Sequence, residues 1–243
     1  MKRCWTEVTA VATDRAGEAG YRIELDGRPV RLPDGDPLHV ASGALARAIA
    51  DEWRLAGKAV GGEFTAEATP LTRLAGTAQI RIAPNPSPTV DALVRYADSD
   101  LLCYRATDPA ALVRRQAERW QPWLDWAALT YDAPLRVTSG ITHVEQSAAG
   151  IGALRAAVAA HRPVVLAGLG IMVPALGSLV LGLAVVEGGL GPEEASRLGA
   201  LDELFQAELW GRDSEAERRR EAVADDIAVA ARLVTLAGGG SPR

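Results

Sequence analysis

Four side chains that could support catalysis lie close together near the middle of the chain: Asp98, Asp100, Cys103 and Arg105. Two neighbouring carboxylates could share general acid and base work. A cysteine beside a cation could be an activated thiol, because a nearby positive charge stabilises the thiolate. The same residues also have a structural interpretation, in which the aspartates end a helix and begin a turn, and the cysteine, which follows two leucines, is buried. A small-molecule enzyme with its site at these residues is therefore one alternative function.

The rest of the sequence offers few patterns on which catalytic sites depend. Its three histidines, His39, His143 and His161, are far apart, and none has a partner at the spacing of metal ligands. The sequence contains no G-x-S-x-G nucleophile motif and no G-x-x-x-x-G-K-[S/T] nucleotide loop. We therefore expect no catalytic residue, no metal site, no cofactor and no enzymatic activity.

Acidic and polar residues accompany a hydrophobic helical stripe near the C-terminus. Leu198, Leu201, Phe205 and Leu209 form the predicted buried stripe of one helix that starts at Gly191–Pro192. Beside the stripe lie the residues that we predict to bind a partner: Glu203, Asp202, Gln206, Trp210, Asp213 and Glu215. Acids next to a large aromatic suit a partner rich in arginine, through charge-assisted contacts at a rim. A solvated turn between two helices is the alternative interpretation.

Glu203 ranks first among these residues. It lies next to the buried Leu204–Phe205 pair, so its backbone is fixed while its side chain can face outward. After Trp210–Gly211, the spacing of Ser214 and Glu217 predicts a capping box at the start of the last helix.

The N-terminal part of the sequence is typical of strands. Asp26–Gly27 lies between two alternating runs, which predicts a tight hairpin that places Ile23 opposite Val30 and Tyr21 opposite Leu32. Another strand is expected before this hairpin and a short one after it.

A helix is expected to follow the strands. Ser42 is a suitable N-cap for it, and Leu45, Ile49 and Trp53 share one face. We expect Trp53 to anchor the helix on the sheet and Glu52, on the other side, to be solvated. The structural anchors predicted for the whole chain are Trp53, Trp120, Trp123 and Phe205.

The uncharged run at residues 163–186 is long enough to cross a membrane. Pro174 divides it into two pieces of about ten residues, a length more typical of buried core helices than of membrane spans. Ser178 can cap the second piece, Leu179 to Val186, which is apolar on all sides. We therefore expect two buried helices and no stable membrane insertion.

These patterns predict an α+β protein. A small β-rich α+β domain at residues 1–84 should precede an all-α helical domain at 88–237, because three alternating prolines within 84–88 mark a boundary. Residues 238–243 are expected to form a disordered tail.

The composition excludes some classes of protein and favours others. A net charge of −5 argues against a nucleic-acid binder, which normally has a basic face. Cys4 and Cys103 are typical of reduced intracellular thiols. The N-terminal sequence resembles neither a signal peptide nor a mitochondrial presequence, so we expect a bacterial cytoplasmic protein.

Four motifs are spread along the chain: AIADEW at 48–53, TPLTRLA at 69–75, YADSDLLCYR at 96–105, and LDELFQ at 201–206 followed by WGRDSEA at 210–216. Together they resemble a family of ATP synthase assembly chaperones, the F1-ATPase assembly factors of the assembly factor 2 type. The chain departs from the family pattern before the proline of the second motif, where a methionine is frequent.

The resemblance implies a function. Family members bind the unassembled α subunit of F1-ATPase and shield its subunit interface until β joins. An isolated α subunit exposes an apolar interface, which is a liability for aggregation. The chaperone contact should be moderate because it must later be released. We expect a monomer with the α subunit as partner. An adaptor with a different protein client is the second alternative function.

Overall fold

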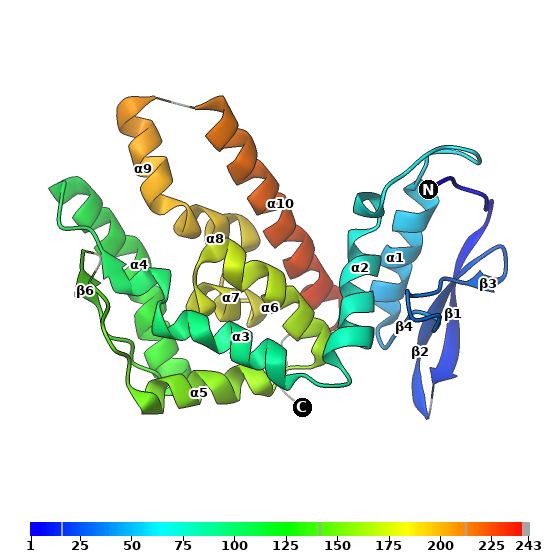
Figure 1. Cartoon of the computed structure of the whole chain (residues 1–243), viewed down its shortest axis with the longest axis horizontal. Helices are drawn as coiled ribbons and strands as arrows, with labels where there is room; N and C mark the ends of the chain where they lie inside the picture. Colours follow the sequence, from blue (N-terminus) through cyan, green and yellow to red (C-terminus); the bar gives the residue numbers. More distant parts are fainter. Residues whose placement is uncertain (16, 141, 212, 240–243) are drawn as a thin grey trace.

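The computed structural model describes residues 1–15, 17–140, 142–211 and 213–239. Antiparallel strands and two helices form the N-terminal part of the molecule, and the remainder is mainly helical (Figure 1). In Figure 1 the strands lie at one end, and α2 and α10 meet where the two parts join. The predicted α+β fold class is confirmed. The predicted tail lies largely outside the described residues.

Four strands form the N-terminal sheet, in which β3 and β4 both pair with β2: β1 (Val8–Arg15), β2 (Glu18–Leu25), β3 (Arg28–Pro29) and β4 (His39–Val40). Asp26 and Gly27 form the predicted turn, with φ angles of 48° and 76° that suit a two-residue hairpin. The Val30 amide donates to the Ile23 carbonyl at 2.8 Å, which confirms that part of the register.

The second predicted pair, Tyr21 opposite Leu32, is wrong. Tyr21 lies opposite Val40 in β4. The chain turns back between Leu32 and Asp36, where the Leu32 amide donates to the Asp36 carbonyl at 2.8 Å. Because of this turn, β4 replaces the continuation of β3 beside β2.

Helix α1 (Gly43–Leu55) packs against this sheet. Ser42 is its N-cap, and its hydroxyl accepts from the Leu45 amide at 3.3 Å, as predicted. Trp53 is half-buried, with its ring centroid 5.1 Å from that of Trp5. Its indole N–H donates to the Thr72 hydroxyl at 3.0 Å, so Trp53 touches both the N-terminal segment and α2 (Pro70–Thr77).

The prediction that Glu52 is solvated is wrong. Its carboxylate is half-buried and accepts from the amides of Leu71 at 2.7 Å and Thr72 at 3.1 Å. These amides are unpaired donors in the first turn of α2, so Glu52 supplies an N-terminal cap from another helix. Burial raises the pKa of Glu52.

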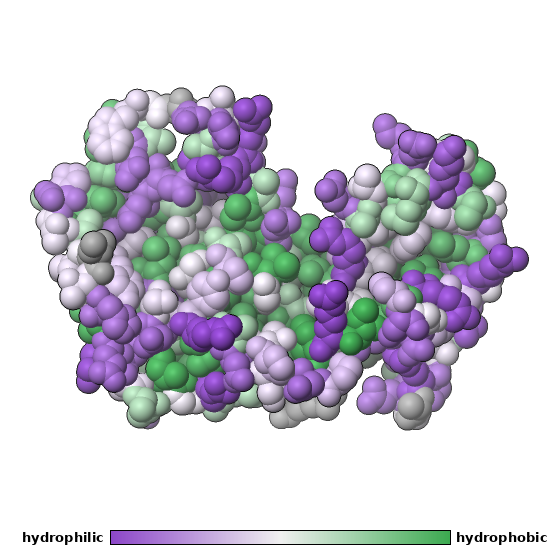
Figure 2. Space-filling model, viewed as in Figure 1, coloured by the Kyte–Doolittle hydropathy of each residue, from purple (hydrophilic) through white to green (hydrophobic). Residues whose placement is uncertain are grey.

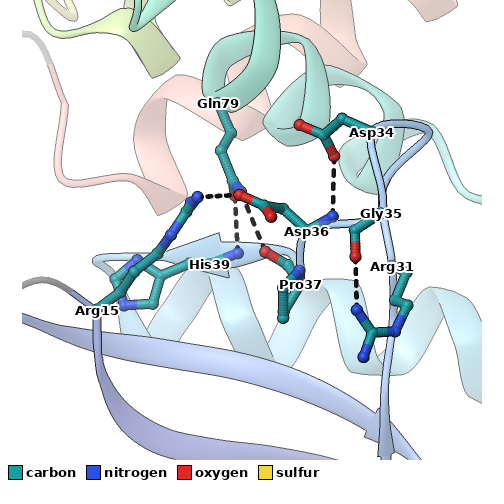
Figure 3. Close-up of polar contacts among 8 residues, drawn as sticks. All are labelled: Arg15, Arg31, Asp34, Gly35, Asp36, Pro37, His39 and Gln79. Atoms are coloured by element: carbon teal, nitrogen blue, oxygen red, sulfur yellow. Dashed lines mark hydrogen bonds and ion pairs between the residues drawn. The ribbon is translucent and has the colours of Figure 1, made fainter.

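Gln79 joins the sheet to the helical segment η2 (Ala78–Ile82), which continues α2 and packs against α6. Its side-chain oxygen accepts from the His39 amide at 2.9 Å, and its nitrogen donates to the Pro37 carbonyl at 3.0 Å. Figure 3 shows these bonds beside the Arg15–Asp36 ion pair. The edge of the sheet is thereby fixed to the helix that faces the rest of the molecule.

The C-terminal part packs its helices around one central helix, α7. The remaining elements are η1 (Ala66–Ala68), α3 (Ser87–Asp98), η3 (Leu101–Cys103), β5 (Tyr104–Arg105), α4 (Ala110–Tyr131), β6 (Thr138–Ser139), α5 (Ala148–Ala159), α6 (Pro163–Leu176), α7 (Leu179–Val186), α8 (Pro192–Gly199), α9 (Leu201–Trp210) and α10 (Ser214–Leu236). Every residue of α7 is buried, and the helix contacts α3, α4, α6, α8 and α10. The predicted domain boundary falls between η2 and α3 and stays a prediction.

The uncharged run forms two helices, as predicted, but the break does not lie at Pro174. Pro174 lies inside α6, which ends at Leu176 and is followed by Gly177 with a left-handed φ of 65°. Ser178 then caps α7 as predicted, with its hydroxyl accepting from the Leu181 amide at 3.0 Å. No helix within the described residues is both long and apolar enough to cross a membrane.

Candidate partner-binding site

The predicted partner-binding residues lie on α9 and at the start of α10. These helices form a hairpin whose tip, where α9 ends and α10 begins, lies at the top of Figure 1, while the other end of α10 reaches α2. The N-cap of α10 is Asp213 and not the predicted Ser214, because the Asp213 carboxylate accepts from the amides of Glu215 at 2.8 Å and Ala216 at 3.3 Å. These hydrogen bonds lower the pKa of Asp213. Asp213 therefore fixes the start of α10 and remains exposed.

Two large apolar side chains are exposed where α9 ends. Trp210 is 79% exposed and Leu209 is 57% exposed. The prediction that Leu209 is buried is wrong. Leu201 and Phe205 of the same stripe are buried, but the last turn of α9, which contains Leu209, buries no side chain. The expected single helix is also two helices, α8 and α9, separated by the non-helical Ala200. An exposed tryptophan with an apolar neighbour is typical of a binding surface.

An open hollow of about 430 Å³ lies between α9 and the start of α10, and we call it the hairpin hollow. Its lining includes Glu203, Gln206, Trp210, Asp213, Arg219 and Arg220. Glu203 is exposed, and its carboxylate lies 3.4 Å from the Arg220 guanidinium. The two arginines were not among the predicted site residues, although they belong to the arginine run at 218–220 of the sequence. The site is therefore of mixed charge.

Figure 2 shows the surroundings of the hairpin on one face of the molecule. A notch separates the hairpin end from the N-terminal part, and hydrophobic residues gather at the base of the notch between hydrophilic rims. The hairpin thus borders a concave, partly apolar surface.

Asp202 differs from Glu203 in its surroundings. It is half-buried, and its carboxylate accepts from the side-chain amide of Gln116 in α4 at 2.8 Å. Phe205, one turn later, is buried beneath Arg115, whose guanidinium carbon lies 4.9 Å from the ring centroid. Asp202 of the predicted site and Phe205, one of the predicted structural anchors, thus face the body of the protein.

The tryptophans of α4 have different environments. Trp120 is fully buried, and its indole N–H donates to the Leu198 carbonyl at the end of α8, at 3.0 Å. Trp123 is half-buried and packs edge-on against Trp126, with 6.2 Å between their ring centroids. Trp120 therefore joins α4 to the end of α8.

The structure places the residues of the alternative catalytic site in different environments, and Asp100 has a structural role. Asp98 is exposed at the end of α3, whereas Asp100 is fully buried. The Asp100 carboxylate accepts from the amides of Leu102 and Val180, each at 3.1 Å, and so caps α7. Burial raises the pKa of Asp100 to about 6.

Cys103 and Arg105 are also buried. Burial, followed by the charge of Asp100, raises the pKa of the Cys103 thiol to about 12, so the thiolate is disfavoured at neutral pH. Arg105 donates to the Leu102 carbonyl at 2.7 Å and to the Gln116 carbonyl at 3.0 Å. These contacts favour the structural interpretation. Among the described residues, no group of three His, Cys, Asp or Glu side chains is placed to hold a metal ion.

The chain is similar to known chaperones over nearly its whole length. Residues 2–128 match the sequence pattern of the ATP12 chaperone protein family. The crystal structure of Atp12 from Paracoccus denitrificans is 41% identical, with a TM-score of 0.89 over 97% of this chain and 98% of that one. A point mutant of the same protein gives 40% identity and the same TM-score. A protein from Agrobacterium tumefaciens is 39% identical, with a TM-score of 0.87 over 96% of this chain and 84% of its own. This protein belongs to the ATP12 family of chaperone proteins.

Proposed function

We propose that the protein is a chaperone for assembly of the F1 sector of ATP synthase, and that it binds the unassembled α subunit as a monomer. Membership of the ATP12 chaperone family supports the chaperone role. The four motifs that resemble F1 assembly factors support the identity of the client. The α subunit would be held until β joins and takes over its interface.

The single observation that carries the proposal is the exposed Trp210 beside the hairpin hollow. Tryptophan is enriched among residues that dominate binding energy, because it buries a large area at little cost in conformational entropy. Leu209 extends this apolar surface, while Glu203 offers a charge on a helix. A mixed apolar and charged surface suits a contact that must form and later be released.

The surface has features that favour a basic segment of the client. Glu203, Asp213 and Glu215 are exposed acids, and the polar Gln206 lies beside them. Arg220 already pairs with Glu203, so a client arginine would compete with an internal cation and the contact would be weaker than with a free acid. This competition favours release.

Glu203→Lys tests the proposal. It reverses the charge at an exposed position and should cost less than about 1 kcal/mol of folding free energy, mostly through the lost pair with Arg220. Loss of a desolvated interfacial charge costs about 2 kcal/mol or more, which corresponds to about thirty-fold weaker binding. We expect weaker capture of purified α subunit at an unchanged melting temperature.

Asp225→Lys is the matched control. It makes the same charge reversal on the exposed side of α10, about 18 Å along the helix from Asp213. Capture should stay within about two-fold of the parent. Equal capture by parent and Glu203→Lys would show that Glu203 does not contact the client, and failure of the parent to bind α subunit would overturn the proposed function.

A further inference from the structure

We propose that Asp202 is a positioning residue, which sets the orientation of α9 through its hydrogen bond to Gln116 and does not itself touch the client. The inference rests on the proposed function and deepens it, because it separates two adjacent acids of the same site. Glu203 presents a charge, and Asp202 holds the helix that presents it.

Gln116 is placed to act as a bridge. Its side chain is 1% exposed and lies between the segment after β5 and the first turn of α9. The side-chain oxygen accepts from the Ala106 amide at 2.7 Å, and the side-chain nitrogen donates to Asp202 at 2.8 Å. Both ends of the amide are therefore occupied.

The direction of these bonds is fixed by chemistry. A backbone amide can only donate, so the oxygen of Gln116 must face Ala106. Its nitrogen then faces Asp202, whose carboxylate can only accept when ionised. The backbone carbonyl of Gln116 also accepts from the buried Arg105 guanidinium at 3.0 Å, so the backbone that carries this side chain is itself held in place. Gln116 thereby joins the central motif at 96–105 to the C-terminal motif at 201–206.

Helix α9 is sensitive to such a bond because little of it is buried. Leu201 and Phe205 are its buried residues. Trp210 lies about 12 Å along the helix from Asp202, so a tilt of about 10° at the first turn would move the tip by about 2 Å. A displacement of that size separates a matched contact from a mismatched one. The bond at Asp202 thus acts on the exposed end of the helix.

The first test changes Asp202, the α9 partner of the hydrogen bond, so that the bond is either kept or removed. Asp202→Asn removes the charge but retains an oxygen that can accept from Gln116, whereas Asp202→Ala removes both. A positioning role predicts that the asparagine variant captures α subunit within about two-fold of the parent, while the alanine variant loses at least ten-fold. A client contact through charge predicts that both variants lose capture equally, and this result would overturn the inference.

The second test reverses the direction of the bond. Gln116→Glu still accepts from Ala106 but faces Asp202 with a second carboxylate, so α9 should be displaced. Adding Asp202→Asn supplies a donor toward the new carboxylate and should restore capture in the double variant. Gln121→Glu is the matched control, because Gln121 also donates to an aspartate, Asp125 at 2.8 Å, within α4. The control should leave capture unchanged.

Amide hydrogen exchange supplies a readout that does not depend on the client. Exchange of residues 201–210 should accelerate in Gln116→Glu and in Asp202→Ala, and return to the parent rate in the double variant. Unchanged exchange in both single variants would overturn the inference. If the parent fails to bind α subunit, the proposed function fails, while the exchange data still decide whether the bond orients α9.

Discussion

Helices α7 and α9 lie in the same part of the molecule and have opposite surroundings. All of α7 is buried, with caps from Ser178 and Asp100 at its start, and five helices contact it. Helix α9 buries two side chains and ends in an exposed tryptophan. We therefore expect α7 to contribute to the stability of the fold and α9 to contribute to recognition of the client. Substitutions in α7 should therefore change folding, and substitutions on the exposed face of α9 should change binding.

The largest effect is expected from Leu183→Ala in α7. Leu183 is fully buried, so its truncation leaves a cavity and should lower the free energy of unfolding by about 2–5 kcal/mol. Leu209→Ala makes the same change in α9 at an exposed site and should cost less than about 0.5 kcal/mol. Denaturant unfolding of both variants measures the contrast. Equal losses would show that the two helices do not differ in this way.

A matched pair of tryptophans extends the contrast to the N-terminal part. Trp53→Arg places a charge where a half-buried ring packs on Trp5, and it also removes the bond to Thr72. We expect a loss of about 2–3 kcal/mol in stability. Trp210→Arg should leave the melting temperature unchanged and weaken α-subunit capture. If Trp53→Arg melts within a degree or two of the parent, Trp53 does not anchor α1.

The cap of α7 should make stability depend on pH. The pKa of buried Asp100 is raised from 3.8 to about 6, so the protonated group is favoured in the folded state. The protonated Asp100 therefore contributes to the free energy of unfolding. This contribution is fully present below about pH 4 and is lost as the pH rises through 6. Asp100→Asn cannot titrate. Relative to the parent, this variant should therefore gain stability between pH 4 and pH 7, on the order of 3 kcal/mol.

Urea unfolding at the two pH values, with Asp98→Asn as control, measures this shift. Asp98 is exposed, so its variant should follow the parent. A constant difference between Asp100→Asn and the parent would mean that Asp100 keeps an ordinary pKa.

The smallest effect is expected at the thiols. Cys103 is buried with a raised pKa, while Cys4 is exposed. In the native protein a thiol reagent should modify Cys4 and leave Cys103 unmodified until denaturant is added.

The purified protein should not hydrolyse ATP. A turnover that persists through purification and disappears in Cys103→Ser would favour the alternative enzyme function.

The sequence alone determined the features that depend on neighbours along the chain. The turn at Asp26–Gly27 follows from residues that tolerate positive φ, and the caps at Ser42 and Ser178 follow from a hydroxyl placed before an apolar run. The burial of α7 follows from its composition, since an uncharged helix needs cover on every side. The motifs were sufficient to indicate the family.

Only the tertiary structure decided which distant groups meet. Glu52 faces the first turn of α2, Asp100 the first turn of α7, and Asp202 the amide of Gln116. A helical pattern shows which face a carboxylate occupies but not which amide another element brings to it. The exposure of Leu209 likewise depends on packing, because the apolar stripe continues to Leu209 but the burial of α9 ends at Phe205. Hydrogen bonds between residues far apart in sequence exist only after the helices pack, so local patterns do not specify them.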